Sequence, residues 1–324
     1  MLMVITLSYP NNIEKLKFYK DKKVLITGSS GLLGSHLFDL LCDSCQEIRL
    51  LVRTSTMKYK EGVSVLYGDI RRSTVVNKII EDVDLIFHLA SLVNVDKSIN
   101  NPIHTIDINV MGIVQLLEAV RKTENMPRIV FSSSADVYGD PKENVITEDH
   151  ALNPSNPYSA SKAAADMICQ AYIKTYDMPI TILRPSSLYG PRQRKTQFIP
   201  TVILQCLSRN ILHLGPLDVY RDFCYVKDVA FAFALAGAIN ESKGQTFNIT
   251  TEQPTNIADI VHKISMLLDK DVKIVKKKEF HRPKVAFHPF IISSLKAKEI
   301  LRWVPRYDLD SGLKETIKWF RQFG

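Results

Sequence analysis

The chain has few of the residues that interrupt regular structure or crosslink a fold. Its 324 residues include only 13 glycines and 15 prolines, which excludes a collagen-like repeat and a predominantly disordered chain. Its five cysteines are odd in number, so a disulfide framework is not expected. Cys42 and Cys45 form a C-x-x-C pair, but no second pair or suitably spaced histidine accompanies it. We therefore expect no metal site, and we place both cysteines at the end of a helix.

Long apolar runs and a secretion signal are also lacking. The longest uninterrupted apolar run, Val229 to Ile239, is far shorter than the ~18 residues of a membrane helix. The first residues carry neither a basic leader nor a small-residue cleavage site, so we expect a cytoplasmic protein without membrane attachment. The net charge of +8 is compatible with an anionic partner. No nucleic-acid-binding motif accompanies it, and no nucleic acid is expected.

Short apolar runs alternate with amphipathic stretches in the first half of the chain. This pattern is typical of an α/β fold with a doubly wound parallel sheet covered by helices. Apolar residues spaced by three and four predict one long helix between Ile103 and Val120, and a second helix is predicted after Pro157. The predicted strands are Lys23–Thr27, Glu47–Val52, Val63–Leu66, Asp84–His88, Arg128–Ser132 and Pro179–Leu183.

The alternation of apolar runs and amphipathic stretches changes after about Gly190, where the predicted strands and helices become shorter. We expect an N-terminal extension over residues 1–21, a sheet domain over 22–190 and a smaller α/β domain over 191–324. Some segments of the last part are expected to return to the sheet domain. Residues 269–284 contain seven Lys or Arg and three acids. This excess is typical of a solvated surface, or of a rim that attracts phosphates.

A glycine-rich segment directly follows the first predicted strand and opens a helix. Glycines permit a sharp turn and let backbone amides approach a pyrophosphate, and the helix N-terminus favours the anion. In this strand–turn–helix setting the segment predicts a dinucleotide site. The residues expected to form it are Gly28, Ser30, Gly31, Leu32, Leu33 and Gly34.

The end of the second predicted strand indicates which dinucleotide binds. An acidic residue there suits the ribose hydroxyl of NAD, whereas a basic residue suits the 2′-phosphate of NADP. Arg53 and two hydroxyl residues stand there instead of an acid. A guanidinium pairs well with a phosphate, so NADP(H) is favoured and NAD(H) is the alternative. Asp69 is a candidate contact for the adenine amino group, or a turn residue.

Three Tyr-x-x-x-Lys pairs occur, at Tyr19, Tyr138 and Tyr158. Only Tyr158 and Lys162 begin a good helix, where residues four apart share a face. We expect the ammonium of Lys162 and an oxidised nicotinamide to lower the pKa of Tyr158, which would make it an acid/base at a sugar hydroxyl. Ser134, just after the predicted strand Arg128–Ser132, could hydrogen-bond the same substrate oxygen.

Together these motifs resemble the extended short-chain dehydrogenase/reductases that act on nucleotide-activated sugars. The resemblance spans about residues 22–323. It rests on the glycine segment, Gly68-Asp-Ile70, Phe87-His-Leu-Ala90, Ser132-Ser-Ser-Ala-Asp-Val-Tyr-Gly139, Tyr158-Ser-Ala-Ser-Lys162, Arg184-Pro-Ser-Ser-Leu-Tyr-Gly-Pro-Arg192 and Arg221-Asp-Phe-Cys-Tyr-Val-Lys-Asp228.

The resemblance implies a Rossmann domain, a C-terminal domain that grips a nucleotide-diphosphate sugar, and a homodimer formed by the two long helices as a four-helix bundle. It implies catalysis by Ser134, Tyr158 and Lys162. Further implied cofactor contacts are Arg53, Asp69, Ile70, Leu89, Ala90, Ser91, Asn109, Ser132, Tyr158, Lys162 and Pro185. The implied substrate contacts are Val93, Ser134, Ser187, Arg192, Arg221 and Arg282.

Departures from the family pattern bear on the subclass. Relatives that eliminate water commonly carry an acidic pair where this chain has Ala135 and Asp136, so only one candidate acid remains. Ser187 stands where many relatives have an asparagine. We therefore expect an epimerase or 4-ketosugar reductase acting at C4. A 4,6-dehydratase or decarboxylase that uses Asp136 is the alternative, and a non-catalytic dinucleotide-binding sensor is an alternative of another class.

Overall fold

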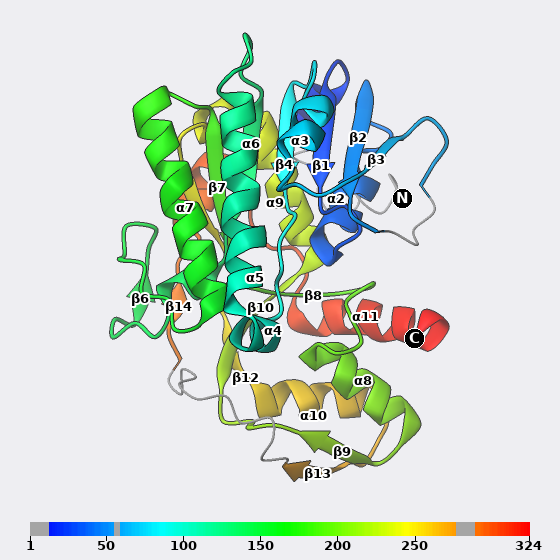
Figure 1. The fold of residues 1–324 in the computed structure, drawn as a ribbon. Coiled ribbons are helices and arrows are strands. Elements are labelled where there is room, and N and C mark those ends of the chain that lie inside the picture. The colour runs from blue at the N-terminus through cyan, green and yellow to red at the C-terminus, as the bar shows by residue number, and fades with distance from the viewer. Residues whose placement is uncertain (1–12, 55–58, 277–288) are drawn as a thin grey trace.

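The computed structural model describes residues 13–54, 59–276 and 289–324, and its centre is a seven-stranded parallel sheet (Figure 1). The strand order is β11-β7-β5-β4-β1-β2-β3. The chain runs outward in both directions from β1 and β4, and the order therefore reverses between these two strands. In open α/β sheets, ligands bind at the carboxyl end of this switch point. The strands are β1 (Lys23–Thr27), β2 (Glu47–Val52), β3 (Ser64–Tyr67), β4 (Leu85–His88), β5 (Arg128–Ser132), β7 (Ile180–Pro185) and β11 (Thr246–Ile249).

The sequence patterns located the first six of these strands to within two residues at each end. The central strands are mostly apolar because helices cover both faces of the sheet. Val24, Leu25 and Ile26 of β1 are all fully buried, for example. The seventh strand, β11, comes from the region after residue 190 and pairs with β7 at the edge of the sheet. The predicted α/β fold with a doubly wound parallel sheet is therefore confirmed.

Two separate apolar cores hold the helices against the sheet. One core joins the sheet to a short N-terminal 3-10 helix and two α-helices, which are η1 (Ile13–Tyr19), α2 (Leu32–Leu41) and α9 (Val226–Ala238). The other core, on the opposite face, contains residues of α3 (Ser73–Ile79), α6 (Gly112–Val120) and α7 (Pro157–Tyr176). Helices such as α6 bury one side against these cores, whereas α9 is buried over almost its whole length and on all sides.

The predicted helix between Ile103 and Val120 is divided by a π-helical turn. It consists of α5 (Pro102–Ile106), the π turn η2 (Asp107–Met111) and α6, and α4 (Val95–Asn100) precedes it. The single buried stripe that we expected is wrong for its first part: Ile103 is 80% exposed, whereas Ile113 is buried. The wider π turn changes the register, so the apolar residues on either side of it face in different directions. By length and hydropathy alone the stretch Pro102–Val120 could also cross a membrane, but half of it is buried in the structure.

The C-terminal region is built from smaller sheets. Its elements gather at the end of the large sheet where β8 follows β7 directly (Figure 1). A third apolar core holds its three helices together. The strands outside the large sheet are β8 (Ser187–Tyr189), β10 (Tyr220–Tyr225) and β12 (Pro254–Asn256) in one sheet, β9 (Ile211–Leu214) with β13 (Lys273–Lys276), and β6 (Val145–Ile146), from the first half of the chain, with β14 (Ile291–Ile292). The helices of the C-terminal region are α8 (Phe198–Ser208), α10 (Ile257–Leu267) and α11 (Leu309–Phe323). Short turns of helix elsewhere are η3 (Ala135–Tyr138), which follows β5, η4 (Asn240–Ser242) and η6 (Ala297–Leu301).

Candidate functional site

The glycine segment forms a tight loop between β1 and α2. Gly28 has a φ of +72°, and a Cβ there would lie 2.7 Å from the backbone nitrogen of Ala90. A Cβ on Gly34 would lie 2.3 Å from the carbonyl oxygen of Gly28. Gly31 caps α2 without a side-chain hydrogen bond, so the first amides of the helix can bind an anion. These features fit a pyrophosphate. Of the other expected loop residues, Ser30 is exposed, Leu32 is half-buried and Leu33 is buried.

The loop after β4 is tied to this turn by side chains that the sequence patterns did not single out. The Thr27 hydroxyl oxygen accepts hydrogen bonds from the backbone amides of Leu89 and Ala90, each at 3.2 Å. His88 lies 3.0 Å from the same hydroxyl through its Nδ1 atom. Burial lowers the pKa of His88 to about 3, so the imidazole is neutral. Thr27 and His88 therefore fix the loop beside Gly28.

Asn109 holds the same loop against α7. Its Nδ2 atom donates to the Leu92 carbonyl at 3.1 Å and to the Ser161 hydroxyl at 2.8 Å. Its Oδ1 atom accepts from the Leu92 amide at 2.7 Å and from the Ser91 hydroxyl at 3.0 Å. An amide has two N–H donors and two acceptor lone pairs, all of which are used here. Asn109 is therefore placed to position the loop rather than to contact a cofactor through its amide group.

The ends of β2 and β3 bring Arg53 and Asp69 to one edge of the sheet. Arg53 is exposed, and its charge contributes to lowering the pKa of Asp69. The carboxylate of Asp69 is held mainly by Arg71, whose Nε and Nη2 atoms lie 2.9 and 2.6 Å from it, and its pKa falls to about 2. Arg71 also pairs with Asp107. Ile70 is buried beneath this cluster.

Tyr158 lies in the first turn of α7. Asn156 and Ser159 form a capping box that starts the helix at this point, and the Tyr158 amide donates to the Ser98 hydroxyl at 3.1 Å. The phenol is buried, and its pKa is raised by burial and by the charge of Asp136, which a hydrogen bond with Ser134 partly offsets. Tyr158, Ser134 and Asp136 are therefore neighbours.

Lys162 lies one turn further along α7, but it does not lower the pKa of Tyr158 as we expected. Its Nζ atom donates to the carbonyl oxygen of Ser132 at 2.8 Å and lies over the Phe131 ring. Burial lowers the pKa of Lys162 to about 8. The expected shift of Tyr158 is therefore wrong for this chain by itself, because removal of the phenol from water dominates.

Asp136 lies on the short helix η3, and Ser134 is the N-cap residue of that helix. Ser134 is buried, and its hydroxyl oxygen accepts from the Asp136 amide at 3.2 Å. Asp136 is exposed, so its carboxylate is accessible from solvent beside Tyr158. The other two Tyr-x-x-x-Lys tyrosines are hydrogen-bonded inside the core: Tyr19 donates to the Ala234 carbonyl, and Tyr138 donates to the Asn248 side chain.

The expected substrate residues lie mostly in and around the C-terminal region. Val93 is exposed just before α4, and Ser187 begins β8, two residues after Pro185 ends β7. Arg221 lies on β10, which pairs with β8, and forms no ion pair with the described residues. Arg192 pairs with Asp39 of α2 and so joins the two parts of the chain. Arg282 lies outside the described residues.

A buried network that the sequence patterns missed lies behind the catalytic candidates. The carboxylate of Asp166 accepts hydrogen bonds from the Ser133 hydroxyl and from two guanidinium nitrogens of Arg184, Nε and Nη2. A usable signal was present for Asp166, which follows Lys162 at the same four-residue spacing that separates Lys162 from Tyr158. No such signal exists for Ser133 and Arg184, because their contact with Asp166 is long-range.

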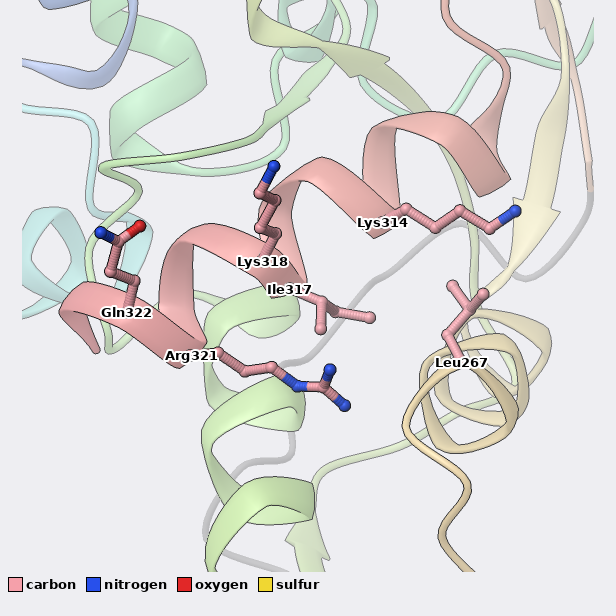
Figure 2. Close-up of a pocket in the computed structure, with 6 residues that line it drawn as sticks. All are labelled: Leu267, Lys314, Ile317, Lys318, Arg321 and Gln322. Atoms are coloured by element: carbon pink, nitrogen blue, oxygen red, sulfur yellow. The ribbon is translucent and has the colours of Figure 1, made fainter.

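A cavity among the described residues is separate from all of these groups. It has a volume of about 370 Å³ and lies between α10 and α11 (Figure 2). Leu267 of α10 and Ile317 of α11 line it. The side chains of four further lining residues project from α11 (Figure 2): Lys314, Lys318, Arg321 and Gln322. None of the expected catalytic, cofactor or substrate residues lines it.

Known proteins resemble the chain over most of its length. It is 32% identical over 92% of its length to a dTDP-glucose 4,6-dehydratase of Salmonella typhimurium, of which it covers 92%. It is 30% identical over 94% of its length to the trifunctional UDP-glucose 4,6-dehydratase/UDP-4-keto-6-deoxy-D-glucose 3,5-epimerase/UDP-4-keto-L-rhamnose-reductase of Arabidopsis thaliana. The chain spans about half the length of this plant relative, 48%.

Solved structures agree with these relatives. A UDP-glucose 4-epimerase of Thermotoga maritima, solved with UDP-glucose, has a TM-score of 0.86 at 26% identity; the match covers 93% of this chain and 99% of that one. A dTDP-glucose 4,6-dehydratase of Streptomyces venezuelae, solved with NAD, has a TM-score of 0.84 at 25% identity, with 93% and 97% covered. A sequence model of the family described as GDP-mannose 4,6 dehydratase matches residues 25–316. The chain belongs to this family of extended short-chain dehydrogenases/reductases.

Proposed function

We propose that the protein is an NAD(P)-dependent enzyme that transfers hydride at a sugar carbon, C4, of a nucleotide-diphosphate sugar, as an epimerase or a 4-ketosugar reductase. The observation that carries this proposal is the meeting of Tyr158, Ser134 and Lys162 at the carboxyl end of β5. That end lies two strands from β1 and its glycine loop, on the same edge of the sheet. Hydride chemistry needs this juxtaposition of a proton carrier and a dinucleotide site.

Each of the three residues has a distinct role in the proposed reaction. A bound nicotinamide dinucleotide exchanges the hydride. Tyr158 gives a proton to the C4 oxygen when a 4-keto group is reduced, and takes it back when the alcohol is oxidised. Ser134 hydrogen-bonds the same oxygen. Lys162 fixes the end of β5 through the Ser132 carbonyl and is placed to hold the nicotinamide ribose. At neutral pH the phenol is protonated, as the proton donor of a reduction must be, and burial raises its pKa further.

The proposed cofactor is NADP(H), with NAD(H) as the alternative. Arg53 is exposed at the end of β2, where a 2′-phosphate would accept its guanidinium. Arg71 pairs with the nearby carboxylate of Asp69, which offsets part of the negative charge beside that phosphate. The solved dehydratase of Streptomyces venezuelae contains NAD, which supports the alternative.

The proposed substrate site uses Arg221 on β10 and Ser187 on β8, the strand that pairs with β10 and ends just before the boundary at residue 190. A guanidinium without an ion pair among the described residues suits a diphosphate. Arg192 contributes only if its ion pair with Asp39 opens. In the domain division that we propose, residues 22–190 bind the dinucleotide and residues 191–324 bind the nucleotide sugar, while α9 and β11 return to the large sheet.

A second candidate function is 4,6-dehydration or decarboxylation. The observation that favours it is the exposed carboxylate of Asp136 next to Tyr158. After oxidation at C4, such a carboxylate could take the C5 proton. The carboxylic acid so formed could pass a proton to the C6 hydroxyl, which would then leave as water. Asp136→Asn separates the two functions: it abolishes elimination but leaves reduction or epimerisation at C4 within about tenfold of the wild type.

We also propose a cytoplasmic homodimer. Ile103, Ile106, Met111 and Met167 are exposed on the helical stretch α5–η2 and on α7, which pack against each other. Burying this apolar face against a second copy would form a four-helix bundle. Light scattering during gel filtration tests the proposal, because Met167→Lys should shift the wild-type dimer to the mass of one chain.

The decisive experiment begins with mass spectrometry of the protein purified with its native ligands. Tightly held NAD supports an epimerase, whereas an empty site that takes up NADPH supports a reductase. A panel of UDP-, dTDP-, CDP- and GDP-sugars and their 4-keto forms is then followed by NMR of the products. Cofactor binding without turnover of any of these sugars would contradict the proposal and favour a non-catalytic dinucleotide-binding sensor.

A further inference from the structure

We infer that Ser133, Asp166 and Arg184 form a positioning device that holds the end of β5 in register with the catalytic face of α7. The inference rests on the proposed function, because it concerns the placement of the groups that carry out the proposed reaction. It adds three residues that do not themselves reach the substrate or the cofactor. We refer to these three residues as the Asp166 network.

The network begins on the same face of α7 as the catalytic candidates. Tyr158, Lys162, Asp166 and Gln170 are spaced four residues apart, so their side chains follow one stripe of the helix. Asp166 is completely buried within this stripe. Its Oδ1 atom accepts from Gln170 Nε2 at 2.7 Å, and its Oδ2 atom accepts from the Ser133 hydroxyl at 2.6 Å.

Arg184, at the end of β7, neutralises this carboxylate. Its Nε and Nη2 atoms donate to the two oxygens of Asp166, each at 2.9 Å. Its third nitrogen, Nη1, donates to the Tyr138 hydroxyl at 2.8 Å and to the Glu148 carbonyl at 3.0 Å. The side chains of Arg184 and Asp166 are 2% and 0% exposed, so the pair has lost nearly all its water. Every oxygen of Asp166 is thereby hydrogen-bonded twice.

Ser133 connects the network to the catalytic groups. Its backbone amide donates to the Leu183 carbonyl at 2.8 Å, which extends the β5–β7 ladder by one residue. Its hydroxyl donates a hydrogen bond to Asp166. Asp166 in turn accepts a hydrogen bond from Arg184, the residue after Leu183. Ser133 is therefore held from two sides. The carbonyl oxygen of Ser132, the residue before it, accepts a hydrogen bond from the Lys162 ammonium. Ser134, the residue after it, is the hydrogen-bond partner of Tyr158.

Stability alone does not account for such an arrangement. A buried ion pair loses hydration on both partners, and apolar residues of the same volume are often as stable or more stable. A fork of two parallel hydrogen bonds does, however, fix direction as well as distance. A displacement of about 1 Å in a catalytic group can cost about 10²-fold in rate. The network thus defines where Ser132 and Ser134 stand relative to Lys162 and Tyr158.

The test compares two variants that each remove one hydrogen bond from the same carboxylate. Ser133→Ala removes the bond that leads to β5. Gln170→Ala removes the bond on the other side, where Gln170 and Arg184 line a small cavity of about 170 Å³ away from the catalytic candidates. Each variant loses about 1 kcal/mol of stability, so both are expected to fold. Turnover of the best sugar of the panel, the Kd of the cofactor and Tm are measured for both.

Ser133→Ala is expected to lower kcat by about tenfold or more, because the catalytic groups on β5 and α7 are no longer held in their relative positions. KM and the Kd of the cofactor should stay within about twofold, since the Ser133 hydroxyl is buried against Asp166. Gln170→Ala should keep kcat within about twofold while its Tm falls as far as that of Ser133→Ala. Equal effects of the two variants on kcat, or a kcat of Ser133→Ala close to that of the wild type, would overturn the inference. Both results require an active wild type, whereas failure of the proposed function would leave the wild type without turnover.

Discussion

The two parts of the molecule hold their functional groups in different ways. In the large sheet, the candidate residues follow successive parallel strands and are fixed by the ladder and by buried hydrogen bonds, as for Ser134 and Lys162. In the C-terminal region, Ser187 and Arg221 lie on short strands of a three-stranded sheet and are only half-buried. Under the proposed function, the chemistry belongs to the large sheet, whose candidate groups are held by buried hydrogen bonds. Recognition of the sugar nucleotide belongs to the C-terminal region, whose candidate groups are held by fewer contacts.

Two ion pairs, one from each part, differ sharply in burial. Asp166 and Arg184 are almost completely buried, whereas Lys263 and Asp310 are 40% and 52% exposed in the C-terminal region. Asp166→Asn should cost about 3–5 kcal/mol of unfolding free energy, because the Arg184 charge remains buried without its partner. Asp310→Asn should cost at most about 1 kcal/mol. Urea unfolding of the two variants measures both values. Similar losses would show that the two parts are not held differently.

The glycine loop should be nearly as intolerant of change. A Cβ on Gly34 would lie 2.3 Å from the Gly28 carbonyl, so Gly34→Ala must displace the backbone that would cradle the pyrophosphate. We expect the cofactor Kd to rise by about 10²-fold. Gly62→Ala is the control, because Gly62 lies outside the loop and a Cβ there would meet no atom within 4 Å, so the cofactor Kd should not change. Titration calorimetry provides the comparison, and equal Kd values would contradict this account of the loop.

Most of the large sheet could be predicted because its signals are local. Each parallel strand is an apolar run of four to six residues, and the glycine loop has its own spacing. The seventh strand, β11, could not be placed, because it reaches the sheet only through its pairing with β7, more than 60 residues earlier in the chain. The π turn of η2 was missed for a related reason, since a one-residue change of register leaves no trace in composition.

The candidate site was predictable to a similar extent. Residues that act through spacing, such as Tyr158 and Lys162, could be found by reading along the chain. The electrostatics could not, because burial of Tyr158 outweighs the ammonium of Lys162, and burial is a property of the whole fold. The partnership of Ser133 with Asp166 and Arg184 depends on three elements that meet only in the folded chain.

Lys162 offers a test of burial through pH. Burial lowers its pKa to about 8, whereas an unfolded lysine titrates near ~10.4. Between these values the unfolded state binds more protons than the folded state, so this residue makes unfolding harder as pH rises. The difference in unfolding free energy between the wild type and Lys162→Met should therefore increase by about 2 kcal/mol from pH 8 to pH 10. A difference that stays constant or decreases would show that burial does not lower the pKa of Lys162.

The smallest effect is expected at the exposed edge of the cofactor site. Arg53→Ala should weaken NADPH binding by about tenfold, because one charge-assisted contact to the 2′-phosphate is lost. The Kd of NADH should not change. Arg209→Ala removes another exposed arginine, from the end of α8, and should alter neither Kd. Fluorescence titration with the two dinucleotides measures these values. An equal loss for NADH and NADPH would contradict the assignment of Arg53 to the phosphate.

The central claim is that the Tyr158 phenol carries the proton that accompanies hydride transfer. Tyr158→Phe removes only its oxygen, so the variant should keep the wild-type cofactor Kd while kcat falls by about 10³-fold. The measurement is steady-state turnover of the best sugar of the panel, with the cofactor Kd determined on the same preparation. A kcat within a few-fold of the wild type would show that another group carries the proton.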